Sequence, residues 1–188
     1  MWKIIKWPLI YFIVQFLLIF ILAYYYVSSG NNMDLFANFL TDKQIYIVII
    51  LGIIFIPLLI NNYRKFKQKS KKINISSLIL LGIVISLLYN FLAYYLNELF
   101  FKNVLYIEQN NMIITLISTG IIGPIIEELM FRGIIYNELK LKVSPMKAIL
   151  LTTLFFAIIH FNILQIIYTF AVAFLFIFFY EKYKDIKA

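Results

Sequence analysis

The sequence from Met112 to Tyr136 reads MIITLISTGIIGPIIEELMFRGIIY, an apolar run that three charged residues interrupt. A helix needs about 20 such residues to cross a hydrocarbon core of about 30 Å. Glu127, Glu128 and Arg132 therefore lie where a charge costs about 2.5–3.5 kcal/mol at the middle of a spanning helix. The stretch predicts a membrane helix whose charges are retained for pairing or for chemistry.

The rest of the chain has the same apolar character. Of its 188 residues, 63% are hydrophobic and only 14% are charged. Apolar blocks of about 17–25 residues recur along it. They cover residues 4–27, 45–60, 75–96, 112–136, 146–161 and 163–180. The blocks predict an all-α fold, a polytopic membrane bundle of about six transmembrane helices, with residues 1–188 as a single integral membrane domain.

The first block, after Lys3 and Lys6, has to be weighed against a cleaved signal peptide. Its apolar core is too long for a signal peptide. Tyr24, Tyr25 and Tyr26 also lie where the aromatic belt of a membrane interface is expected. We therefore expect a retained helix.

Basic residues gather in three clusters between or after the apolar blocks. The clusters are Arg64, Lys65, Lys67, Lys69, Lys71 and Lys72; Lys140, Lys142 and Lys147; and Lys182, Lys184 and Lys187. Cytoplasmic loops carry an excess of Lys and Arg, and the block order places all three clusters on one side. The net charge of +8 thus indicates orientation rather than nucleic-acid binding, with both termini cytoplasmic. Ile, Phe, Tyr, Asn and Lys are abundant, as in proteins encoded by A/T-rich bacterial genomes. We therefore expect a bacterial protein located in the cell membrane.

The two glutamates are predicted to differ in role. At about 100° per residue, Glu128 and Arg132 lie on one helix face and can pair, whereas Glu127 points about 100° away. The pair has two interpretations, an ion pair that fixes packing or part of a functional site. Nothing near Glu127 in the sequence neutralises it, which makes it the stronger functional candidate.

Small residues precede the glutamates at Gly120 and Gly123, followed by Pro124. Pro124 cannot donate to the helical ladder, and glycines permit the close approach of a neighbouring helix. The segment predicts either small-residue helix packing or a bend that admits water.

His160 is the single histidine, within the sequence FAIIHFN. A histidine near a helix end is often only an interfacial residue. Beside a carboxylate such as Glu127, however, an imidazole supplies what is needed to deprotonate a water and return the proton to a leaving amine. The sequence therefore offers one candidate acid–base pair, Glu127 with His160.

Other chemistries have less support. There is no cysteine and no HExxH zinc pair, and the aspartates lie outside the apolar blocks. Ser118 lacks a recognisable nucleophile turn. A metal would find His160, Glu127 and Glu128 as its only obvious ligands, too few to assert a zinc site. We predict no cofactor, with a divalent metal not excluded.

The pattern EExxxR from Glu127 to Arg132, followed by FxxxH ending at His160, resembles the first two motifs of a protease family. This is the CPBP family of intramembrane proteases (CAAX protease and bacteriocin-processing, or Abi). The resemblance spans Gly120 to Asn162. It implies an all-helical membrane protease in which Glu127 and His160 activate a water for peptide-bond hydrolysis without a metal. Supporting roles fall to the second glutamate and the arginine of the first motif.

The resemblance also indicates the substrate class. Eukaryotic relatives trim prenylated CAAX proteins, and bacterial ones are associated with bacteriocin self-immunity, peptide maturation or surface-protein display. The implied partners are the lipid bilayer and a peptide or membrane-anchored protein, with no nucleic acid.

The family commonly has a third motif, a second histidine followed four residues later by asparagine or aspartate, that stabilises the oxyanion. This chain reaches Ala188 without a second histidine. The substitutes on offer are Asn162 and Gln165, with Tyr168 and Thr169 as further polar residues. Losing an oxyanion donor costs about 10²–10³ in rate.

Two functions besides an active protease are left open. A catalytically weak or inactive family member would act as a bacteriocin immunity or surface-display membrane protein. A small transporter would use Glu127 and His160 as a proton relay, although this leaves the paired motifs unexplained.

Overall fold

The computed structural model describes residues 2–68, 112–160 and 163–184, together with isolated positions between residues 76 and 95. The described residues contain helices and no strand, which confirms the predicted all-α class. They cluster into two compact units, Met1–Phe66 with Ile107–Glu138 and Lys67–Tyr106 with Leu139–Ala188. The single domain over residues 1–188 stays a prediction, and most of the predicted third helix (residues 75–96) lies outside the described residues.

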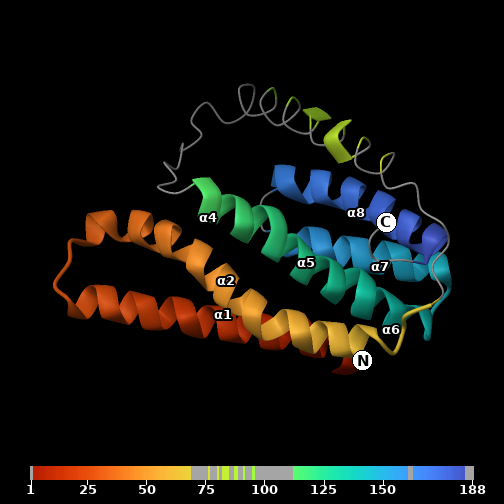
Figure 1. The fold of residues 1–188 in the computed structure, drawn as a ribbon, viewed down its shortest axis with the longest axis horizontal. Coiled ribbons are helices and arrows are strands. Elements are labelled where there is room, and N and C mark those ends of the chain that lie inside the picture. Colours follow the sequence, from red (N-terminus) through yellow and green to blue (C-terminus); the bar gives the residue numbers. More distant parts are fainter. Residues whose placement is uncertain are drawn as a thin grey trace. The chain divides into compact units, whose positions relative to one another are not determined.

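Two long helices open the first unit, α1 (Trp2–Ser28) and α2 (Phe36–Tyr63), which run antiparallel side by side (Figure 1). The chain turns between them at Gly30, whose φ of +70° is a conformation that glycine adopts without steric cost. A 3-10 turn, η1 (Met33–Leu35), leads into α2. The helix begins well before the apolar block at residue 45, because helical hydrogen bonds continue beyond the part that hydrophobicity marks.

The predicted fourth helix is one continuous helical run whose hydrogen-bond register changes along its length. Its segments are α4 (Met112–Ile117), η2 (Ser118–Ile122), α5 (Gly123–Glu127), η3 (Glu128–Tyr136) and α6 (Asn137–Lys140). The segments η2 and η3 are π-helical, with hydrogen bonds that span five residues, as from the Gly123 N–H to the Ser118 carbonyl. Pro124 follows at the start of α5, where its missing N–H is tolerated best. Because π-helical turns cluster at functional sites, the register change draws attention to the glutamates.

Close packing joins α2 to η2 at Gly52. A Cβ built on Gly52 would lie 2.3 Å from Cγ2 of Ile122, closer than two carbon atoms can approach. Within the described part of the chain, no atom of another helix lies within 4 Å of the corresponding position at Gly120 or Gly123. The small-residue packing predicted for these two glycines is therefore found at Gly52 of the neighbouring helix α2.

We expect Gly52→Ala to destabilise the protein by about 1–3 kcal/mol, because the added methyl group forces the β-branched Ile122 side chain and its helix to shift. Unfolding of purified protein in detergent with increasing SDS measures the change. Gly82→Ala is the matched control, since a Cβ there would meet no atom of a described residue within 4 Å. Equal stability of Gly52→Ala and the parent chain would show that the α2–η2 contact is not close-packed.

The second unit is built on two helices that pack against each other, α7 (Pro145–Ile158) and α8 (Ile163–Tyr183) (Figure 1). The helix α7 begins after Ser144, with Pro145 in its first turn, where helices tolerate proline. At the far end of α8, the Glu181 carboxylate accepts from Lys140 Nζ at 2.5 Å and also pairs with Lys184. These partly exposed pairs hold the segment before α7 against the end of α8.

Four of the described helices are long and apolar enough to cross a membrane. They cover Ile4–Ser28, Met33–Tyr63, Met112–Lys140 and Gln165–Tyr183, and the shorter apolar helix α7 lies between the last two. The chain is therefore a multi-pass membrane protein. The cytoplasmic placement of both termini stays a prediction.

Candidate functional site

The predicted ion pair between Glu128 and Arg132 is present. The Arg132 guanidinium pairs with Glu128 Oε2 across one turn of η3, and the two side chains are 9% and 25% exposed. The arginine lies in a buried stretch, since every residue from Leu129 to Tyr136 is buried. Asn137 follows η3 and donates from its side chain to the carbonyls of Arg132 and Gly133, at 2.9 Å and 3.0 Å. The amide thereby satisfies carbonyl groups that the change of helical register frees at this end.

Glu127 lies one residue earlier, at the end of α5, and is half-buried. It has no salt bridge with a described residue, but its carboxylate interacts electrostatically with Arg132. That no residue near it in the sequence neutralises Glu127 stays a prediction. The Arg132 guanidinium pairs with Glu128 and acts on Glu127 only through its field.

Tyr11, on α1, also interacts electrostatically with Glu127. Its ring packs edge-to-face against Phe55 of α2, with the ring centroids 5.2 Å apart. Tyr11 is half-buried, on a helix that also contacts η3. Among the described residues, no hydrogen bond joins the Tyr11 hydroxyl to Glu127. Sequence reasoning missed Tyr11, because one tyrosine in an apolar, aromatic-rich helix carries no signal of its own.

We expect Tyr11→Phe to lower any Glu127-dependent hydrolysis about tenfold, within the range of a group that orients a reacting water. The change removes only the hydroxyl and keeps the ring contact with Phe55. Initial rates of the purified variants would measure it, with Tyr25→Phe as control because Tyr25 is 63% exposed on the same helix. Unchanged rates in Tyr11→Phe would assign this tyrosine to packing alone.

His160 lies in the turn just after α7, half-buried, rather than within the helix. Its Nδ1 is 2.8 Å from the Phe156 carbonyl, and the two rings pack edge-to-face with centroids 4.9 Å apart. A carbonyl oxygen only accepts, so Nδ1 carries the proton in this contact and Nε2 of the neutral ring keeps its lone pair. The FxxxH spacing thus has a physical role, since Phe156 fixes both the ring and its tautomer.

The groups predicted to replace the third motif differ in their surroundings. Asn162 lies outside the described residues. Thr169 is buried on α8 and donates to the Gln165 carbonyl of its own helix at 2.6 Å. The Gln165 side chain is exposed. The Thr169 hydroxyl therefore already donates a hydrogen bond within α8.

The first unit thus holds Glu127 with Tyr11 and the Glu128–Arg132 pair, and the second holds His160. The pairing of Glu127 with His160 joins residues of different units and stays a prediction. In the part of the chain that the structure describes, no group of three or more metal-binding side chains is placed to hold an ion. Taken singly, Glu127 can accept a proton from water, and Nε2 of His160 can accept or return one.

Both motifs fall within a stretch that matches a known protein family. Residues 109–188 match the family described as type II CAAX prenyl endopeptidase Rce1-like. Over these residues the sequence is similar to the Rce1-like family. The resemblance predicted from the EExxxR and FxxxH motifs is thereby confirmed. No curated protein and no solved structure shows significant similarity to the chain.

The Rce1-like segment begins just before α4 and includes α7 and α8. It therefore contains Glu127, Glu128, Arg132 and His160, whereas α1 and α2 precede it. The Rce1-like family is a family of proteases. Peptide-bond hydrolysis is therefore the general chemistry that these residues are compared with.

Proposed function

We propose that this Rce1-like protein is an intramembrane, glutamate-dependent endopeptidase in which Glu127 and His160 activate a water. Glu127 takes a proton from the water as it attacks the peptide carbonyl, and this proton then passes to His160 Nε2 and on to the leaving amine as the C–N bond breaks. Glu128 and Arg132 hold the Glu127 segment of the helix in place. The substrate is a peptide or a membrane-anchored protein cut near the bilayer.

The observation that carries this proposal is the family match across both motifs, together with the separation of roles between adjacent glutamates. Glu128 is occupied by its contact with Arg132. Glu127 has no salt bridge with a described residue and keeps its carboxylate for a proton. A packing role would explain one paired glutamate, but it gives no reason for a second at this depth.

Purified chain in lipid nanodiscs, incubated with a library of membrane-anchored peptides and followed by mass spectrometry, tests the proposal. We expect discrete cleavage products that disappear in Glu127→Gln and in His160→Ala. Cleavage that persists in both variants would assign the activity to a contaminant or to other residues.

The second candidate is a family member that binds partners in the bilayer without cleaving them, as in bacteriocin immunity or surface display. The observation that favours it is that the buried Thr169, one of the polar residues that could replace the family's oxyanion donor, already donates within its own helix. In that case Glu127→Gln should leave protection or display unchanged in cells. Loss of the phenotype in Glu127→Gln would return the assignment to the protease.

A further inference from the structure

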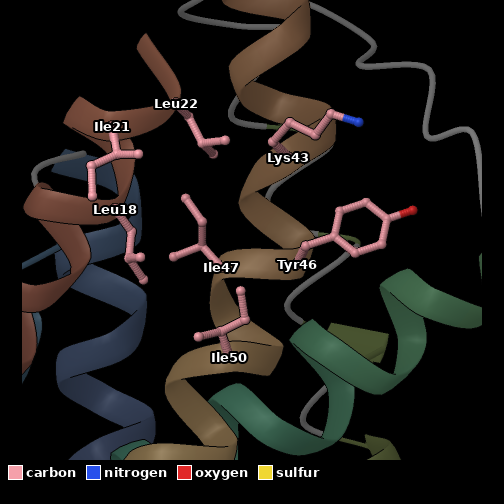
Figure 2. A pocket seen from close by; sticks show the side chains of 7 residues that line it. All are labelled: Leu18, Ile21, Leu22, Lys43, Tyr46, Ile47 and Ile50. Carbon is pink, nitrogen blue, oxygen red and sulfur yellow. The ribbon is translucent and has the colours of Figure 1, made fainter. Parts of the chain in front are cut away.

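A cavity of about 310 Å³ lies between α1 and α2, in the first unit and outside the Rce1-like segment. Its volume falls at the lower end of the range for small-ligand pockets, about 300–1,000 Å³. Aliphatic side chains from both helices face one another across it (Figure 2). They are Leu18, Ile21 and Leu22 on α1 and Ile47 and Ile50 on α2.

The cavity is open to the surroundings of the helices. Ile47 is buried at its floor, whereas Ile21 and Ile50 are 60% and 44% exposed at its rim. Both helices are long and apolar enough to cross a membrane, so we expect the exposed rim to face the hydrocarbon region of the bilayer. The medium outside the cavity is therefore lipid, and an acyl chain is the apolar group available to enter it.

One end of the cavity carries a positive charge. The methylene stem of Lys43 lines the wall, and its ammonium points out of the cavity (Figure 2). The amine lies between two rings, 5.9 Å from the centroid of Phe39 and 5.6 Å from that of Tyr46. Within the described part of the chain, Lys43 has no carboxylate partner. Asp42 precedes it, but consecutive helical residues point about 100° apart.

Lys43 also lies at the depth that a headgroup requires. It is two turns into α2, which begins at Phe36, and opposite Leu22 near the end of α1. A lysine at such a depth extends its ammonium toward the interface while its stem stays in the apolar region. We therefore expect the ammonium to lie at headgroup level, at the end of the cavity that the Lys43 stem lines.

We propose that the α1–α2 cavity binds one anionic phospholipid, with an acyl chain in the cavity and the phosphate on Lys43. Charge complementarity selects the occupant, because a zwitterionic lipid would bring its own cation to the same position. The inference does not depend on the proposed peptidase activity, since none of the lining residues belongs to the candidate site.

Native mass spectrometry of the full chain, with phosphatidylglycerol or phosphatidylcholine of identical acyl chains, tests the proposal. We expect the parent chain to retain phosphatidylglycerol about fivefold more strongly, the value for roughly one lysine acting on an anionic lipid. Lys43→Gln should remove that preference and leave phosphatidylcholine retention unchanged. Lys65→Gln is the matched control, because Lys65 is an exposed lysine just beyond the other end of α2.

A second variant tests the cavity itself. Leu22→Trp fills the space between the helices and should lower the retention of both lipids, while far-UV circular dichroism checks that the variant is still helical. Equal retention of the two lipids by the parent chain overturns the proposal. So does a preference that survives Lys43→Gln, or retention that survives Leu22→Trp in a folded protein.

Discussion

Glu127→Gln is expected to lower the rate of peptide hydrolysis about 10²–10⁴-fold, the usual contribution of a general base. Glutamine has the same shape and fills the same space at the end of α5, so the packing of the helix is retained. Only the ability to take up a proton from water is lost. The measurement is kcat on a peptide substrate, and KM should change little because substrate contacts are kept.

The matched control is Glu138→Gln, which makes the same chemical change on the same helical run, in α6. We expect it to retain the parent rate, because Glu138 lies beyond the π-helical segment and outside the candidate site. A fall of the same size in both variants would mean that removing negative charge anywhere on this helix inactivates the protein. Full activity in Glu127→Gln would exclude Glu127 as the base.

Arg132→Met is expected to cost about 3–5 kcal/mol of stability, because it leaves the Glu128 charge buried without its partner. Methionine is a flexible apolar side chain of comparable length, so loss of packing contributes little. Unfolding in mixed detergent and SDS measures the effect. An Arg132→Met protein as stable as the parent would show that the ion pair contributes nothing to the fold.

The double variant Glu128→Gln with Arg132→Met separates packing from function. A buried ion pair replaced by neutral groups is often as stable as the original, so we expect most of the lost stability to return. Hydrolysis should stay impaired, because the field of Arg132 on Glu127 is still absent. Recovery of both stability and rate would reduce the pair to a packing device.

Sequence periodicity predicted the features that depend on local geometry. The ends of α1 and α8 lie close to the ends of their apolar blocks, and the four-residue spacing of Glu128 and Arg132 produced the ion pair. These succeeded because hydrophobic length and helical repeat act within one segment. The hydrogen bond from His160 to the Phe156 carbonyl of the preceding helix was not predicted, although both residues belong to the FxxxH motif.

Features that depend on backbone register or on distant segments escaped prediction. The π-helical bonds of η2 and η3 are one such feature, because periodicity at 3.6 residues per turn cannot reveal a change of register. The electrostatic interaction of Tyr11 with Glu127 depends on where α1 packs, which the sequence of one helix does not reveal. The close packing at Gly52 also depends on a distant segment, because the residue that lies opposite a glycine belongs to the neighbouring helix.

A double-mutant cycle on kcat/KM with Glu127→Gln, His160→Ala and their combination tests most directly whether these residues act on one water. Groups that act as a unit are strongly non-additive, because removing either one already abolishes the shared step. We predict that the double variant is no slower than the slower single variant, within about twofold. Rate losses that multiply, or a single variant that retains the parent rate, would contradict a water held jointly by Glu127 and His160.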